Sequence, residues 1–128
     1  MKLLLDTHTI VWTMNGGPRL SRAARAAIAS PTNQAFVSAA SIWEASIKFH
    51  LGRFPDAALL VDNPRKVLES LELEGLQISI EHSRLAGSLV NMHKDPFDRM
   101  LAAQALLEGM MLVSADLVFD EVSVQRLW

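Results

Sequence analysis

The fold of this chain is restricted above all by its short apolar runs, each of which stops at a polar residue. Such runs occur at residues 2–5, 35–38, 76–80 and 111–114, and residues 122–127 are a candidate fifth. Helical patterns separate them, and strands that alternate with helices form a parallel sheet covered on both faces. The sequence therefore predicts an α/β fold, and its 128 residues suffice for one domain spanning residues 1–128.

Helix signals fill the segments between these runs. The expected helices cover residues 10–15, 22–29, 41–51, 64–73, 81–92 and 95–108. Ser21 precedes the second helix as an N-cap, and Gly52 and Gly109 follow the third and the last, where helices favour glycine. No element is assigned to residues 54–63.

Composition limits the partners and the compartment. The chain is 50% hydrophobic and 20% charged, so we expect some apolar surface to be buried by a partner or in a dimer. A net charge of −2 and a pI near 6.0 argue against a generic nucleic-acid binder, unless bound cations reverse the local charge of carboxylates. The absence of cysteine excludes disulfides and cysteine zinc sites and fits a cytoplasmic protein, and we expect no signal peptide or membrane span.

Four carboxylates are expected at one edge of the predicted sheet. Asp6 follows the first strand and Asp116 follows the fourth, while Glu44 and Asp98 lie near the beginnings of two helices. In open parallel sheets, ligands bind outside the carboxyl ends of the strands. Clustered carboxylates repel one another unless a hard cation such as Mg²⁺ or Mn²⁺ compensates them. Such ions support the hydrolysis of phosphodiesters, so the four residues are candidates for a metal-dependent site.

Each carboxylate also has a structural explanation. Asp6 can cap the helix that follows it, and Asp116 can begin a turn. Ser41 and Glu44 fit a capping box, and Glu44 is spaced for an ion pair with Lys48, so Glu44 taken alone is better explained as structural. Asp95 is a good N-cap for the last helix, with Asp98 in its first turn.

Three segments and a terminal Leu-Trp carry a resemblance that covers essentially the whole chain. They are LLLDTHTIVW at residues 3–12, SAASIWEASIKFHLGRF at 38–54 and HKDPFDRMLAAQALLEGMMLVSAD at 93–116. In their order and spacing they resemble the PIN-domain proteins, and most closely the VapC-type toxins of bacterial toxin–antitoxin pairs. The resemblance implies a parallel sheet of about five strands sandwiched between helices, and Mg²⁺- or Mn²⁺-dependent endoribonuclease activity.

The resemblance also assigns roles to particular residues. Asp6, Glu44, Asp98 and Asp116 match the four acids of the family, which implies that they hold the metal and are catalytic. Ser114 matches the Ser or Thr beside the fourth acid. Both Asp95 and Asp98 belong to the motif, and we expect Asp98 to be the ligand and Asp95 to be a cap or an outer, supporting residue.

The expected substrate is RNA, cleaved to a 5′-phosphate and a 3′-hydroxyl. Four cations flank the acidic motifs and are candidates to bind substrate phosphates: Lys48, Arg53, Lys94 and Arg99. Each is equally well explained as a solvated charge at a helix end. The resemblance implies a cognate antitoxin as partner and favours a homodimer.

Rival functions are weaker. A receiver-type phosphoacceptor domain needs a Lys after the last strand, and this chain has no Lys beyond Lys94. A haloacid-dehalogenase-like phosphatase needs a second Asp at the position where this chain has His8. The serious alternative is a catalytically inert PIN-like protein-interaction module. Of the aromatic residues and histidines, His8 and His93 lie near the site in the sequence, and His50 and His82 are expected at the surface. Core packing is the first expectation for Trp12, Trp43 and Trp128, and burial in an interface is the second.

Overall fold

Five parallel strands form the centre of the protein. The computed structural model describes residues 1–90, 92 and 95–128. The strands are β1 (Lys2–Leu5), β2 (Gln34–Ser38), β3 (Glu74–Leu76), β4 (Met111–Val113) and β5 (Arg126–Leu127), in the order β3-β2-β1-β4-β5. Every pairing between neighbours is parallel, which confirms the predicted α/β class. The central strand β1 therefore has a neighbour on each side, and its side chains Leu3, Leu4 and Leu5 are fully buried.

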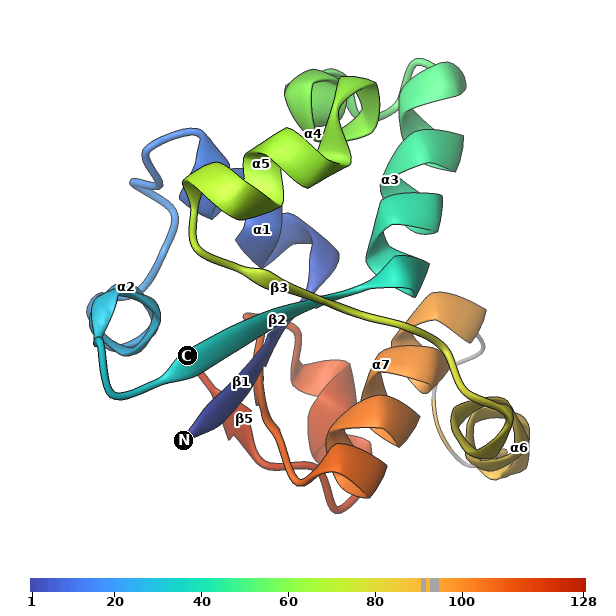
Figure 1. The fold of residues 1–128 in the computed structure, drawn as a ribbon. Coiled ribbons are helices and arrows are strands. Elements are labelled where there is room, and N and C mark those ends of the chain that lie inside the picture. Colours follow the sequence, from blue (N-terminus) through green and yellow to red (C-terminus); the bar gives the residue numbers. More distant parts are fainter. Residues whose placement is uncertain (91, 93–94) are drawn as a thin grey trace.

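Helices cover both faces of this sheet (Figure 1). They are α1 (Thr7–Met14), α2 (Arg22–Ala29), α3 (Ala39–His50), α4 (Ala58–Asp62), α5 (Pro64–Ser70), α6 (Ile80–Ser88) and α7 (Pro96–Glu108). The described residues also form two short 3₁₀ helices, η1 (Pro55–Ala57) and η2 (Leu117–Glu121). None of the helices in the described part of the chain is long and apolar enough to cross a membrane.

Two apolar clusters, one on each face, hold the helices to the sheet. Leu3 and Leu5 point into the cluster that α1, α2, α4 and α5 cover, whereas Leu4 points into the cluster under α7 and η2. This follows from the alternation of side chains along a strand, which sends neighbouring residues to opposite faces. The run of three leucines is therefore buried on both sides, as in a central parallel strand.

The third strand is placed differently from the prediction. The alternating pattern predicts a strand over residues 76–80, but β3 covers Glu74–Leu76 and the chain is already helical at Ile80. Ser79 caps α6: its hydroxyl accepts the His82 backbone N–H, and the His82 ring accepts the Ser79 N–H, each at 3.0 Å. This capping box competes successfully with the weak strand pattern, because it satisfies two backbone donors at once.

The start of α3 also differs from the prediction. We expected the helix to begin at Ser41, whereas it begins at Ala39, with Ser38 as the N-cap that accepts the Ala40 N–H at 3.0 Å. The predicted capping box between Ser41 and Glu44 does not form. The Ser41 hydroxyl is buried inside the helix without a hydrogen-bond partner among the described residues.

Other boundaries move by a few residues. The first helix begins at Thr7, directly after Asp6, and not at residue 10. The helix predicted over 64–73 ends at Ser70, the helix predicted over 81–92 ends at Ser88, and the candidate strand over 122–127 is reduced to Arg126–Leu127. Residues 54–63 form η1 and α4. The last helix, with Pro96 at its first position and Gly109 at φ 64° after its end, was predicted correctly.

Candidate active site

A hollow at the carboxyl end of the central strands gathers carboxylates from four parts of the fold. It has a volume of about 420 Å³, and the residues that line it are Asp6, Thr7, His8, Trp12, Arg19, Glu44, Lys48, Asp95, Asp98, Leu101, Ala115 and Asp116. The four acids that the sequence singled out thus face one space. They converge because β1 and β4 are parallel neighbours, so the residues that follow the two strands lie at the same edge of the sheet.

Asp6 is held by its own helix and by the end of β4. One carboxylate oxygen, Oδ1, accepts the backbone N–H of Thr9 at 2.8 Å, which makes Asp6 the N-cap of α1. The other, Oδ2, accepts a hydrogen bond from the hydroxyl of Ser114. The cap predicted from the sequence is therefore present, and the same carboxylate is also fixed in the hollow. Capping α1 does not exclude Asp6 from contacting a ligand in the hollow.

Glu44 is buried, with a side chain only 6% exposed. Its Oε1 accepts the hydroxyl of Thr7 at 2.6 Å, and its Oε2 lies 2.6 Å from the Lys48 ammonium. The predicted pairing with Lys48 is present, but the pair belongs to the hollow and not to an open helix surface. A buried carboxylate needs such donors, because removing an ion from water is costly.

Asp98 lies in the first turn of α7, which Asp95 caps. The Asp95 carboxylate accepts the N–H of Phe97 at 2.8 Å and that of Asp98 at 3.4 Å, so the predicted cap is present. Burial raises the pKa of Asp98 first of all, and the nearby charges raise it further, to about 7; those charges are Asp95, Glu44, Asp116 and Asp6. Asp98 is thus the carboxylate that carries the electrostatic cost of the cluster.

Asp116 completes the set from the loop after β4. Its backbone N–H donates to the Ser114 hydroxyl at 3.0 Å, and its carboxylate accepts the N–H of Val118 at 3.0 Å as the cap of η2. Ser114 therefore contacts two members of the cluster, Asp6 through its proton and Asp116 through its oxygen. Asp116 itself is exposed, and it is the most open of the four acids.

The donor set fits a hard divalent cation in its chemistry. All of the candidate ligands are carboxylate oxygens, which Mg²⁺ and Mn²⁺ prefer, and their mutual repulsion is what a bound cation would relieve. Within the described ranges, no three Asp, Glu or His side chains are already arranged around a common ion position. Asp6, Glu44, Asp98 and Asp116, which all line the hollow, are therefore the candidate ligands of such an ion.

The cations of the site are only partly those expected. Lys48 lines the hollow. Partial burial lowers its pKa, but its hydrogen bond to Glu44 and the charges of Glu44, Asp95 and Asp98 raise the pKa above its ordinary value overall. Arg19, to which no sequence motif points, lines it as well.

Two further expected cations, both among the described residues, do not line the hollow. Arg53 is exposed, and Arg99 donates to the Met92 carbonyl at 3.3 Å. Lys94 and His93 lie outside the described residues.

Two aromatic predictions need revision. His82 was expected at the surface, but it is 3% exposed and its Nε2 lies 3.3 Å from Glu108. Core packing was the first expectation for Trp43, but its side chain is 61% exposed, which leaves interface burial, the second expectation, as a prediction. Trp12 packs against the core cluster as expected, and it also lines the acidic hollow beside His8. Thr7, Trp12 and Arg19 were missed as site residues. Thr7 and Trp12 fall within the first matching segment, which was a usable signal, whereas nothing local distinguishes Arg19.

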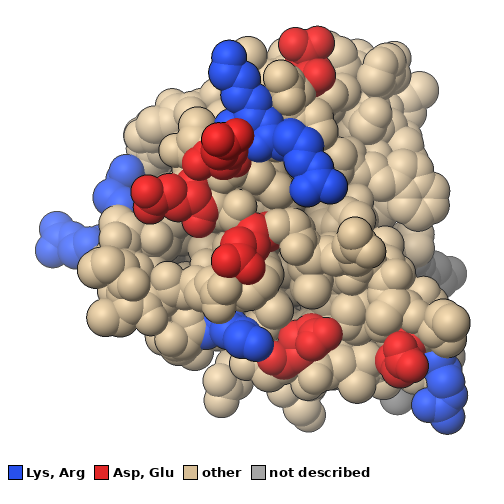
Figure 2. Space-filling view, in the orientation of Figure 1, with Lys and Arg blue, Asp and Glu red and all other residues tan. Residues whose placement is uncertain are grey.

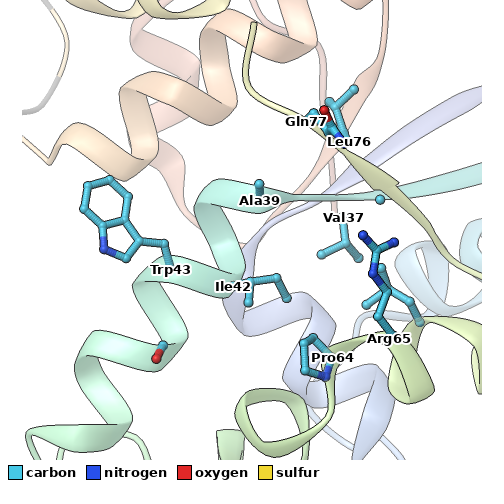
Figure 3. Close-up of a pocket in the computed structure, with 11 residues that line it drawn as sticks. Val37, Ala39, Ile42, Trp43, Pro64, Arg65, Leu76 and Gln77 are labelled. Atoms are coloured by element: carbon cyan, nitrogen blue, oxygen red, sulfur yellow. The ribbon is translucent and has the colours of Figure 1, made fainter.

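A second hollow, of about 520 Å³, lies over β2 and β3 between α3 and α5. Figure 3 shows Val37, Ile42, Pro64 and Arg65 around it, with Trp43 at the outer end, where its ring lies 5.2 Å from that of Phe97. Its lining is largely apolar and contains no carboxylate. This hollow offers contact area but no catalytic group, which leaves the acidic hollow as the candidate active site.

Comparisons with known proteins agree with the fold. A comparison with curated proteins found no match. The chain is similar in structure to VapBC2 from Rickettsia felis bound to promoter DNA (15% identity, TM-score 0.70, 99% of this chain and 98% of that chain). It is also similar to a toxin–antitoxin complex from Klebsiella pneumoniae (17%, 0.67, 98% and 96%) and to VapBC-1 from nontypeable Haemophilus influenzae (15%, 0.65, 99% and 97%).

At such identities these similarities show the fold alone. The sequence model of the PIN domain family matches residues 3–125, which is nearly the whole chain. The match includes Asp6, Glu44, Asp98 and Asp116. The chain therefore belongs to the PIN domain family.

Proposed function

We propose that this protein is a metal-dependent endoribonuclease whose site is the acidic hollow. The observation that carries the proposal is the convergence of Asp6, Glu44, Asp98 and Asp116 on one space, where burial and mutual repulsion raise the pKa of Asp98 to about 7. A carboxylate with such a raised pKa, lying among other carboxylates in a hollow, is typical of a functional site, and it costs stability unless a ligand compensates it.

The residues of the chain have distinct tasks in this proposal. Mg²⁺ or Mn²⁺, when bound, polarises the phosphate and lowers the pKa of water. Asp6 and Asp98 are the central ligands, and Glu44 and Asp116 bind directly or through water. Ser114 and Thr7 hold two of these carboxylates in position by donating to Asp6 and Glu44. Lys48 and Arg19 are the cations that face the substrate phosphates.

Purified protein incubated with total RNA, with and without Mn²⁺, tests this function. We expect cleavage only with the metal, cut ends bearing 5′-phosphate, and loss of cleavage in Asp6→Asn and Asp98→Asn. Glu81→Gln is the matched control, because Glu81 is an exposed carboxylate of α6 that does not line the hollow. Wild-type cleavage by both hollow variants would refute the mechanism.

We further propose that the protein is the toxin of a toxin–antitoxin pair, with a cognate antitoxin as partner, and that it is a homodimer. Its structural neighbours include a toxin–antitoxin complex and two VapBC complexes, which supports the pairing. Large apolar side chains that remain exposed, among them Trp43, Leu59, Ile80 and Leu117, support a partner surface.

The test is to express the chain alone and with the product of an adjacent reading frame, and to measure growth and molecular mass. We expect growth arrest by the chain alone, rescue on co-expression, and a dimer mass for the purified protein. If a variant that does not cleave RNA still arrests growth, and the partner relieves that arrest, the inert interaction module is favoured instead.

A further inference from the structure

One wall of the acidic hollow is aromatic and carries a guanidinium. The wall consists of His8 and Trp12 of α1 and Arg19 of the loop that follows α1, and all three line the hollow together with the carboxylates. The His8 and Trp12 ring centroids are 5.7 Å apart, and Arg19 Cζ lies 6.0 Å from the Trp12 centroid. We call these three residues the aromatic wall.

The wall is supported from behind. His8 and Trp12 are four residues apart on α1 and so share a face of the helix. The Trp12 ring packs against Trp128, with centroids 5.7 Å apart, and the His8 ring lies 5.1 Å from Phe54, which is 8% exposed. These contacts hold two planar groups in place before any ligand binds, which reduces the entropy lost on binding.

Core packing does not account for the whole wall. His8 and Arg19 are exposed, although they stand directly beside rings that are at least half-buried. Within the described part of the chain, Arg19 makes no ion pair with a carboxylate. A guanidinium beside an indole, both facing a hollow, is an arrangement that receives planar π systems and anions.

The electrostatics of the molecule favour an additional source of RNA affinity. The chain has a net charge of −2, and the hollow itself contains five carboxylates, which repel a polyanion. The face seen in Figure 2 offers no broad basic patch, because Lys and Arg there are interspersed with Asp and Glu. Stacking of bases on aromatic rings and on guanidinium planes supplies affinity that does not depend on net charge.

We propose that the aromatic wall is a subsite for an unpaired base of the RNA, adjacent to the phosphate at the carboxylate cluster. This inference rests on the proposed ribonuclease function. The base stacks on the exposed surface formed by His8 and Arg19, while the Arg19 guanidinium also faces the neighbouring phosphate. Trp12 positions both groups from behind.

Binding is measured first, without cleavage. The probe is a short unstructured oligoribonucleotide titrated into Asp6→Asn protein, followed by fluorescence anisotropy. We expect His8→Ala and Arg19→Gln, added to that background, each to weaken binding about tenfold, because one stacking contact is lost. Both residues are exposed, so these variants should fold. His50→Ala is the matched control, since His50 is exposed and does not line the acidic hollow.

Kinetics on the metal-loaded wild-type background separate stacking from a structural effect. We expect the two wall variants to raise KM about tenfold with kcat changed less than about twofold. An RNA with one abasic nucleotide beside the cut should bind wild-type protein more weakly, by the same factor as a wall substitution causes. His8→Ala should bind this abasic RNA no more weakly than it binds the intact RNA. That non-additivity is specific to a base-stacking contact.

The outcomes distinguish this inference from the proposed function. If the protein cleaves RNA and the wall variants bind and cleave like the wild type, the subsite is refuted while the ribonuclease stands. If the wild type cleaves no RNA, the proposed function fails, and the binding experiment tests the wall separately. Equal affinity of the wall variants and His50→Ala for the oligoribonucleotide then refutes the subsite.

Discussion

At the scale of single residues, Glu44 shows how the site is held together. Its spacing from Lys48 predicts an ordinary helix-surface pair, yet the side chain is buried and receives a second donor from Thr7 at 2.6 Å. The two donors come from different helices, α1 and α3. Glu44 therefore links the end of β1 to the helix after β2, and its orientation depends on both.

This linkage predicts the effect of Thr7→Val, which removes the hydroxyl at nearly constant volume. Glu44 would be left with one donor fewer in a buried position, so we expect a loss of about 1–2 kcal/mol of unfolding free energy and about tenfold lower RNA cleavage. Urea unfolding and cleavage rates measure the two effects. Thr13→Val is the control, because its hydroxyl donates only to the Thr9 carbonyl of its own helix.

Asp98 gives a prediction for pH. Its pKa is about 7 in the folded protein, raised from an ordinary value of 3.8 by burial and by its acidic neighbours. Between these two values the folded protein retains a proton that the unfolded chain has released. Stability of the metal-free protein therefore falls as pH rises from about 4 through about 7.

Asp98→Asn removes this dependence. At pH 8 in a chelator, we expect the variant to be more stable than wild type by about 1–2 kcal/mol, less than the full shift implies because the site is partly open to solvent. At pH 5 the difference should be smaller. Urea unfolding at both pH values measures this difference in unfolding free energy, with Glu81→Gln as control. If the unfolding free energies of wild type and Asp98→Asn changed in parallel with pH, the raised pKa of Asp98 would be contradicted.

At the scale of elements, α6 and α7 show when local signals are sufficient. In α7, Asp95, Pro96 and Gly109 all agree on the boundaries, and the helix forms where the sequence predicts it. Before α6, an alternating strand pattern and a capping box overlap, and the capping box prevails. Local prediction succeeds where the signals agree and fails where two compete.

The capping box can be tested through Ser79→Ala. The change removes the acceptor of the His82 N–H, so we expect a loss of about 1 kcal/mol in unfolding free energy. RNA cleavage per folded molecule should stay unchanged, because Ser79 does not line the acidic hollow. Ser83→Ala on the same helix is the control, since Ser83 is exposed and only donates to the Ser79 carbonyl. An equal loss in both variants would argue against the cap.

At the scale of the whole molecule, the strand order determines where the chemistry is. With β4 paired beside β1, the residues after both strands meet, although Asp6 and Ser114 are 108 positions apart in the chain. The helix α7 delivers Asp98, and α3 delivers Glu44, to the same edge. The fold thus concentrates negative charge that each separate segment would keep dispersed.

Cation binding should therefore stabilise the folded protein as a whole. We expect millimolar Mn²⁺ or Mg²⁺ to raise the wild-type Tm by several degrees, because the ion binds the folded cluster and not the unfolded chain. Asp6→Asn should show a much smaller rise, and Glu81→Gln the full rise. Thermal unfolding with and without the ion measures this. Equal shifts in all three proteins would indicate non-specific binding to surface carboxylates.

The sequence by itself determined the α/β class, the central strand at Lys2–Leu5, the bounds of α7 and the four acids that face the hollow. Those features depend on runs, caps and spacings that are local or that match a family over the whole chain. Only the tertiary structure decided that Glu44 is buried against Thr7, that Ser114 donates to Asp6, and that Arg19 and Trp12 form a wall of the site. These are contacts between segments distant in the chain, and no local pattern encodes them, because they arise from strand order and helix packing.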